Sequence, residues 1–202
     1  PKVLKTALTK VVIELKRIEK KYSYFDQSSL LSKINNSAGT GRSICIDEEF
    51  AGLLYYADAL FRESNGAFDP TAGVLRELWK FDQPKLPDQT DLSRKLTCVG
   101  WEKLEWSNKS ARLPYKGMQI DFGGIVKEYA VDFASQIIRD FRIESALVDL
   151  SGDLSVIGSK PNGLPWEISI KHPRRADSSS AIMKLVDVAV ATSGDYERSF
   201  IL

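Results

Sequence analysis

Apolar residues recur at helical spacing near the start of the chain, over residues 3–21, and lysines fill much of the opposite face. This spacing predicts a long amphipathic helix. Its apolar positions are Leu4, Leu8, Val11, Val12, Leu15 and Ile18. A second long helix is expected after Asp47, whose carboxylate can cap it, and Gly66 is expected to end it. Shorter helices are expected over residues 28–35 and from Asp69-Pro70-Thr71 onward, since proline suits a first helical turn.

Strand-like patterns dominate the second half of the chain. Short apolar or alternating runs predict strands over 43–46, 104–106, 111–113, 145–157, 166–170 and 182–191. Ser151-Gly152-Asp153 interrupts the run 145–157 and indicates a bulge or turn. Residues 82–93 are polar, contain Pro84 and Pro87, and predict a surface loop. Helices early and strands late favour an α+β fold, with helices packed on a mostly antiparallel sheet in a single domain over residues 1–202.

The segment from Asp121 to Asp132 joins an apolar run to a helical pattern. Met118-Gln119-Ile120 predicts a strand before it, and Tyr129, Phe133, Ile137 and Phe141 recur every four residues after it. Gly123 and Gly124 leave open space at the start of this helix, where unpaired N–H groups and a partial positive charge can bind a phosphate. Asp121 could hold a divalent cation or the polar edge of a ring. A Gly-Gly turn between a strand and a helix is also a common connection that binds no ligand.

Four segments place Gly beside Asp at the end of a regular element. They are 66–71, 121–124, 151–153 and 192–196. Asp and Gly favour turns and helix caps for local reasons, so each segment alone has a structural explanation. Together they could converge on one cleft that binds a polyphosphate, with Mg²⁺ or a cation such as Lys127 between phosphate and carboxylates.

Other candidate residues have structural alternatives. Lys127 lies one turn inside the predicted helix, within reach of an anion at its start, or else is a solvated surface lysine. Tyr24, Phe25 and Phe68 could stack on a planar ring, although apolar aromatics are more often core residues. His172 is the one histidine, and its Pro-Arg-Arg context favours a surface loop over catalysis.

Composition narrows the classes of protein to consider. The 202 residues are 43% hydrophobic and 27% charged, which is typical of a globular protein. The net charge of +1 gives no argument for nucleic acid binding. Cys45 and Cys98 are far apart without CxxC spacing, which argues against a zinc site and leaves their redox state open. The sequence shows neither an apolar run of membrane-spanning length nor a signal peptide. Because the chain begins and stops inside apolar patterns, we expect both ends to continue in the natural protein.

Several motifs, in a fixed order, resemble the FAD:protein FMN transferases (ApbE-like flavin transferases). The matching segments are Ser23 to Phe25, Ser29 to Asn35, Ser64 to Thr71 with Gly73 and Trp79, Asp121 to Asp132, Leu150 to Leu154, Trp166, and Thr192 to Arg198. The resemblance covers nearly the whole chain. It implies a magnesium-dependent enzyme that binds FAD in a cleft and attaches FMN to a Thr or Ser of a partner protein.

The resemblance also implies roles for individual residues. Asp121 and Lys127 would contact FAD, and Gly124 would offer its carbonyl to Mg²⁺. The flavin or adenosine pocket would be lined by Ala67, Phe68 and Asp69. Phe25 would occupy a position where relatives place a tyrosine, and Ser193 and Tyr196 would lie near the reacting phosphates.

The sequence departs from the family pattern in three places. The catalytic base and the remaining metal ligands are expected beyond residue 202, and a first strand is expected before residue 1. Glu128 stands where relatives commonly carry glycine. An FAD-binding or FAD-hydrolysing protein without transfer activity is therefore the alternative function. The family's usual acceptors imply a flavoprotein subunit of a membrane redox complex. They also imply a periplasmic, lipid-anchored parent at the outer face of the bacterial inner membrane.

Overall fold

The computed structural model describes residues 2–81, 85–175 and 178–194. The chain forms two compact units. The first, called unit 1, contains the residues up to Ile18 and those from Val126 onward, and unit 2 contains Glu19–Ile125. The expectation of a single domain concerns the whole chain and stays a prediction.

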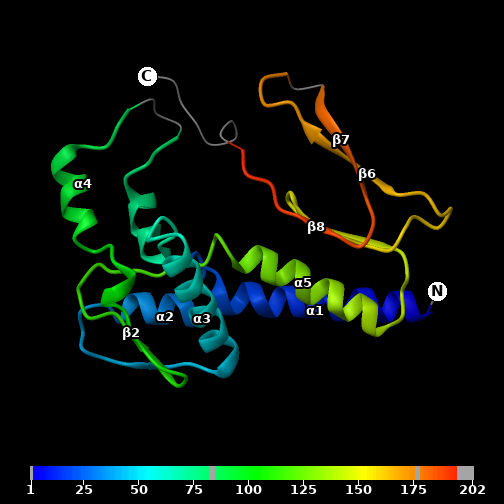
Figure 1. The fold of residues 1–202 in the computed structure, drawn as a ribbon. Coiled ribbons are helices and arrows are strands. Elements are labelled where there is room, and N and C mark those ends of the chain that lie inside the picture. The colour runs from blue at the N-terminus through cyan, green and yellow to red at the C-terminus, as the bar shows by residue number, and fades with distance from the viewer. Residues whose placement is uncertain (1, 82–84, 176–177, 195–202) are drawn as a thin grey trace. The chain divides into compact units, whose positions relative to one another are not determined.

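Unit 1 is built on two helices that lie side by side, α1 (Lys2–Tyr22) as far as Ile18 and α5 (Val126–Asp140) (Figure 1). A hairpin of β4 (Ala146–Leu150) and β5 (Asp153–Ile157) supplies further core residues, and β8 (Ala189–Val190) pairs antiparallel with β5. Together these elements bury Val11, Val131, Ala134, Ile138, Val148 and Ile157. Ser151 and Gly152 join β4 to β5 with φ of 55° and 95°, which confirms the predicted turn.

The strand predicted over 182–191 is wrong as a single element. Strand β7 (Ser179–Leu185) pairs with β6 (Trp166–Lys171) in a separate two-stranded sheet, whereas β8 belongs to the β4–β5 sheet. Asp187 breaks the run because it adopts a left-handed φ of 48° and accepts a hydrogen bond from the Gly158 N–H at 2.7 Å.

Unit 2 contains α2 (Leu30–Asn36), α3 (Glu48–Glu63), α4 (Gln89–Leu96) and two 3₁₀ helices, η1 (Pro70–Glu77) and η2 (Trp101–Lys103). A small antiparallel sheet has the order β1 (Ile44–Cys45), β3 (Ser110–Arg112), β2 (Glu105–Trp106). The buried rings of Tyr22, Phe50 and Phe122 form the aromatic centre of the core, with Phe50 5.5 Å from Tyr22 and 5.3 Å from Phe122 between ring centroids.

Helix caps follow the sequence closely. The Asp47 carboxylate accepts the Phe50 N–H at 2.9 Å, as predicted, and Ser29 accepts the Ser32 N–H at 2.9 Å. The loop predicted over 82–93 is wrong from residue 89, where α4 begins. Asp88 caps α4 by accepting the N–H groups of Thr90 and Asp91 at 2.8 and 3.2 Å. None of the residues of α4 is buried, so no apolar stripe marked this helix.

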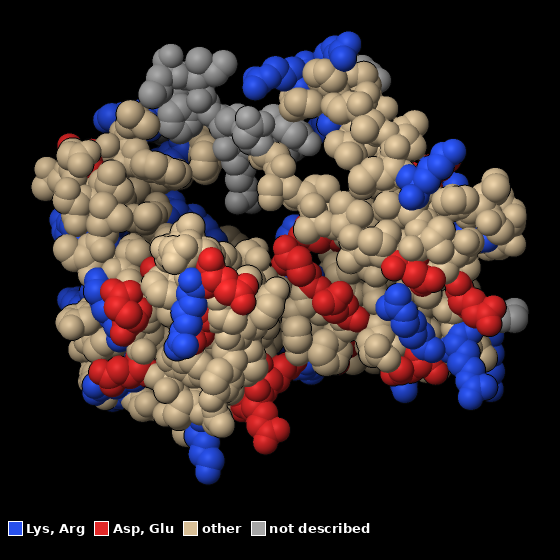
Figure 2. Space-filling view, viewed as in Figure 1, with Lys and Arg blue, Asp and Glu red and all other residues tan. Residues whose placement is uncertain are grey.

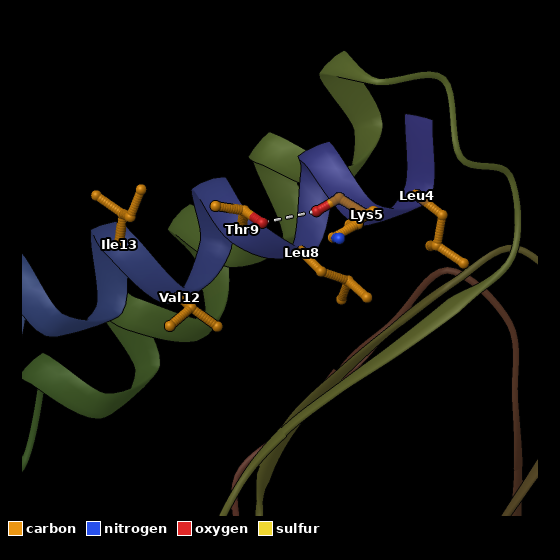
Figure 3. A pocket seen from close by; sticks show the side chains of 6 residues that line it. All are labelled: Leu4, Lys5, Leu8, Thr9, Val12 and Ile13. Carbon is orange, nitrogen blue, oxygen red and sulfur yellow. Dashed lines mark hydrogen bonds between the residues drawn. The ribbon is translucent and has the colours of Figure 1, made fainter. Parts of the chain in front are cut away.

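The buried faces of the long helices match the predicted apolar positions only in part, since Val11 and Ile18 of α1 are buried as predicted whereas Leu4, Leu8 and Val12 are exposed. In α5, Phe133 is 39% exposed, and the buried face instead carries Ala130, Val131, Ala134, Ser135 and Ile138. In α1, Ala7, Val11 and Ile18 are buried. A shallow apolar groove remains on α1 beside Lys5 and Thr9, lined by Leu4, Leu8, Val12 and Ile13 (Figure 3).

The α+β fold class is confirmed, because helices accompany strands that pair antiparallel in each of the described sheets. Basic and acidic side chains are interspersed on the face seen in Figure 2. Cys45 and Cys98 are free thiols. Among the described helices, none is both long and apolar enough to cross a membrane.

Candidate functional site

The segment before Asp121 is buried but is not a strand, which corrects the prediction for residues 118–120. Met118, Ile120 and Phe122 are each fully buried. The backbone of Ile120 is instead held by the side chain of Asn35 at the end of α2. Asn35 Nδ2 donates to the Ile120 carbonyl at 2.9 Å, and Asn35 Oδ1 accepts the Ile120 N–H at 2.8 Å. One amide side chain therefore replaces the neighbouring strand and fixes the backbone next to Asp121.

Asp121 is held tightly on all sides within unit 2. Its N–H donates to the Pro70 carbonyl at 3.0 Å, and its Oδ1 accepts the Gly123 N–H at 2.8 Å. Its Oδ2 forms an ion pair with Arg76 of η1. A β-carbon on Gly73 would lie 2.4 Å from the Asp121 β-carbon, so η1 can approach Asp121 this closely only because residue 73 is glycine.

Arg76 is a site residue that the sequence reasoning missed. Its guanidinium carbon lies 4.6 Å from the ring centroid of Tyr24 and 5.5 Å from that of Phe25. The two rings meet edge to face, and Phe25 is 80% exposed. Phe25 is therefore not a core residue, and a charged, planar group already lies against the aromatic pair that was predicted to stack on a ring.

A chain of polar contacts lies behind this aromatic pair. The Tyr24 hydroxyl donates to Gln119 Oε1 at 2.7 Å, and Gln119 Nε2 donates to Glu77 Oε1 at 2.8 Å. Glu77 also forms an ion pair with Lys95 of α4. The hydrogen bond from Lys95 is the main reason that the pKa of the Glu77 carboxyl lies below its usual range, with a further contribution from Gln119 against some desolvation. The network fixes the orientation of the Tyr24 ring.

The segment 67–69 is divided between surface and structure. Ala67 is exposed and Phe68 is half-buried. The Phe68 ring lies beside Gly124, where a β-carbon would meet it at 3.0 Å. Asp69 accepts the Thr71 N–H and hydroxyl at 2.7 and 2.6 Å through Oδ1, and the Trp101 N–H at 3.2 Å through Oδ2. Both of its carboxylate oxygens are therefore engaged in capping η1 and fixing η2.

In unit 1, Lys127 forms an ion pair with a nearly buried carboxylate. Its Nζ lies 2.5 Å from Oδ2 of Asp153, a side chain that is 5% exposed. Asp153 Oδ1 accepts the Thr192 N–H at 3.3 Å, and the Thr192 hydroxyl donates to the Gly152 carbonyl at 2.9 Å. Ser193 is exposed. Tyr196 lies outside the described residues.

The four Gly/Asp segments come together in pairs. Within unit 2, the segments 66–71 and 121–124 meet through the hydrogen bond between Asp121 and Pro70. Within unit 1, the segments 151–153 and 192–196 meet through Thr192. Each pair places a carboxylate beside a cation, Asp121 with Arg76 and Asp153 with Lys127.

The described residues do not assemble a complete metal site. They contain no group of three or more His, Cys, Asp or Glu side chains that could hold a metal ion. Gly124, the predicted carbonyl ligand, is exposed at the turn before α5. Asp121 already gives both of its oxygens to Gly123 and Arg76.

The chain is similar to curated flavin transferases over most of its length. It is 32% identical to the FAD:protein FMN transferase of Chlamydia pneumoniae and 30% identical to that of Treponema pallidum, over 89% and 96% of this chain. It spans only 56% and 58% of the length of these two relatives.

Solved structures agree with the sequence comparison. The apbE protein of Thermotoga maritima matches with a TM-score of 0.86 and 35% identity, and the flavin transferase ApbE of Vibrio cholerae with a TM-score of 0.85 and 25% identity. Each match covers 98% of this chain and 65% of the other. The model of the ApbE family itself matches residues 2–201. The fold, the order of the motifs and these matches together show that the chain belongs to the ApbE family.

Proposed function

We propose that the protein transfers FMN from FAD to the hydroxyl of a Thr or Ser in a partner flavoprotein. The strongest support from the geometry is the environment of Asp121 in unit 2. Its carboxylate is held by Gly123 and Arg76 at a Gly-Gly turn, and the same Arg76 lies over the aromatic pair Tyr24 and Phe25. A fixed charge pair beside exposed aromatic surface suits a ligand with a phosphate group and a planar ring.

In the proposed reaction, the acceptor hydroxyl oxygen attacks the phosphorus on the FMN side of the FAD pyrophosphate. A P–O bond forms, the P–O bond to the AMP phosphate breaks, AMP leaves, and the hydroxyl proton passes to a base. Such a transfer depends mainly on positioning the phosphates and neutralising their charge. We propose that Phe25, Ala67, Phe68 and Asp69 contact the rings of FAD. Asp121, Lys127, Ser193 and Tyr196 would contact its more polar parts.

The proposed dependence on Mg²⁺ comes from the family resemblance. Because the residues that the structure describes do not fit a complete metal site, we assign no step of the reaction to the ion. Gly124 remains the proposed carbonyl ligand of Mg²⁺. The base that takes the hydroxyl proton is not assigned to a residue. Titration with FAD in the presence of Mg²⁺, and again after removal of the ion with EDTA, tests this dependence directly.

The partner and location of the protein are proposals of the same kind. We propose an acceptor that is a flavoprotein subunit of a membrane redox complex, and a periplasmic, lipid-anchored parent protein. Fractionation of cells that produce the natural protein, with detection in the membrane and soluble fractions, tests the location.

The first experiment on function is binding and transfer with the Asp121→Asn variant. Calorimetric titration with FAD should show binding by the natural chain and at least tenfold weaker binding by the variant. Asp91→Asn is the matched control, because Asp91 is a half-exposed helix aspartate that also pairs with an arginine, Arg94. Failure of the natural chain to bind FAD would refute the proposal.

Transfer is then measured with the full-length natural protein, as covalent flavin fluorescence on a flavoprotein subunit that carries the acceptor hydroxyl. The same subunit with the acceptor residue replaced by alanine is the control. Release of AMP without labelling would favour the alternative, an FAD-hydrolysing protein. Binding without either product would favour a flavin carrier.

A further inference from the structure

Arg76 and Asp121 meet because of the geometry of η1. In a 3₁₀ helix, residues three apart lie above one another, so Gly73 and Arg76 share one face. Asp121 lies against this face, since its β-carbon would be 2.4 Å from a β-carbon on Gly73. The approach over Gly73 brings the Asp121 carboxylate to the Arg76 guanidinium. The pair is therefore built into the packing of η1 and is not a chance contact between two long surface side chains.

The guanidinium of Arg76 is fixed in position and orientation. Asp121 accepts a hydrogen bond from Nη2, while Tyr24 and Phe25 lie 4.6 and 5.5 Å from the guanidinium carbon. The Tyr24 ring is in turn held by Gln119. The Arg76 side chain is still 38% exposed. Because a guanidinium carries five N–H groups and Asp121 accepts at Nη2, an N–H edge remains for an anion that approaches from solvent.

Charge explains why this edge matters to a flavin nucleotide. FAD and FMN carry phosphate, and a phosphate near the Asp121 carboxylate alone would be repelled. The ion pair with Arg76 neutralises that carboxylate. Lys127, the cation that the sequence suggested for this role, is paired with Asp153 at 2.5 Å. Within unit 2, Arg76 is thus the cation beside Asp121.

We propose that Arg76 is the specificity-determining residue through which the site prefers flavins with a phosphate group over riboflavin. The proposal rests on the proposed flavin transfer and names the side chain that binds the phosphate of the substrate. The guanidinium offers its remaining N–H groups to phosphate oxygens, while Tyr24 and Phe25 lie against it and Asp121 accepts a hydrogen bond from Nη2. A planar fork of this kind can bind two phosphate oxygens at once, which a lysine cannot do.

A different role for Arg76 would give a different result. If the guanidinium only covered the faces of Tyr24 and Phe25, its removal would uncover aromatic surface. Riboflavin and FAD would then bind more tightly, and by the same factor, because both carry the flavin ring. The ratio of the affinities for FMN and riboflavin therefore separates phosphate recognition from a covering role or a purely structural one.

The test is equilibrium binding of FAD, FMN and riboflavin to the natural chain and to Arg76 variants, followed by quenching of flavin fluorescence. Arg76→Ala should weaken binding of FAD and FMN at least tenfold and change binding of riboflavin less than twofold. Arg76→Lys keeps the charge without the planar fork, so its affinities for FAD and FMN should lie between those of the natural chain and those of Arg76→Ala. Higher salt should reduce the ratio of the FMN affinity to the riboflavin affinity more in the natural chain than in Arg76→Ala.

Two further variants keep the test decisive. Arg94→Ala, which removes an exposed arginine from its pair with Asp91, should leave all three affinities unchanged. Arg76→Gln can still donate to Asp121 without a charge, and it replaces Arg76→Ala if the alanine variant fails to fold. Equal changes for riboflavin and FMN, or no change, would overturn the role of Arg76 while the proposed function stands. If the natural chain binds none of the flavins, the proposed function fails, and the role of Arg76 fails with it.

Discussion

Replacement of Asn35 by alanine tests how the site segment is held. The Asn35 side chain makes both hydrogen bonds of the Ile120 backbone, at 2.9 and 2.8 Å, and Ile120 is fully buried. Alanine leaves one buried N–H and one buried carbonyl without these partners. Each such group costs about 1–3 kcal/mol. Because Asn35 itself is only half-buried, water can reach part of the site, and we expect a total loss of roughly 2–4 kcal/mol.

The loss is large enough to measure by urea and thermal denaturation. A loss of about 3 kcal/mol corresponds to a fall in Tm of roughly 6–12 °C for a chain of this size. The same variant should weaken FAD binding, because the segment that carries Asp121 is no longer fixed.

Asn36→Ala is the matched control for this change. Asn36 is the next residue in α2, and its amide makes an exposed hydrogen bond of 3.1 Å to Gln27. Its replacement should change the free energy of unfolding by no more than about 0.5 kcal/mol. A loss in Asn35→Ala that does not exceed the loss in Asn36→Ala would refute the reasoning that a side chain holds this segment.

Three further predictions concern other contacts. Lys127→Met should lower the free energy of unfolding by about 1–2 kcal/mol, because it leaves the buried Asp153 carboxylate without its cation. In urea denaturation, adding Asp153→Asn to this variant should restore most of the loss, and an equally unstable double variant would contradict this. Because its folded pKa is lowered, the Glu77 carboxylate should stabilise the protein fully above the unfolded pKa of about 4.3 and lose this effect as pH falls through the folded pKa. Lys95→Met should therefore flatten the dependence of Tm on pH in the acid range, and an unchanged dependence would contradict the contribution of the Glu77–Lys95 ion pair. Asp88→Ala should speed amide exchange over residues 89–96, because α4 loses its cap, while the Tm of the whole chain hardly moves because α4 buries no residue. A large fall in Tm would contradict this.

The parts of the fold that could be read from the sequence depend on local chemistry. The helix after Asp47 is marked by a capping carboxylate and apolar spacing, and both act within one turn. The turn at Ser151 and Gly152 is marked by two residue types common in turns, of which Gly152 tolerates a positive φ. The α+β class followed from such local signals in their order along the chain.

The errors arose where distant residues or missing apolar contrast decide the structure. Met118 to Ile120 has a strand pattern, but Asn35, which is far away in sequence, takes the hydrogen bonds that a neighbouring strand would make. Helix α4 has a good cap in Asp88 and no buried face, so hydrophobic periodicity could not reveal it.

The candidate site was predicted in part for the same reason. The sequence singled out Asp121 from its Gly-Gly neighbours, and the structure gives that residue a fixed place. Arg76 carried no motif of its own, since its role depends on Asp121 reaching η1 across Gly73. A pair of this kind becomes visible only when the two segments are placed together.

The close approach at Gly73 also limits how this site can vary among homologues. The backbone of Gly73 does not have a left-handed φ, so a larger residue would fit the local conformation. The obstacle is the Asp121 β-carbon, which every residue except glycine possesses. Shortening Asp121 to alanine would therefore not make room for a side chain at position 73. Among relatives that keep this packing, positions 73 and 121 should covary so that at least one of them is glycine, and any lineage that keeps the carboxylate must keep the glycine opposite it.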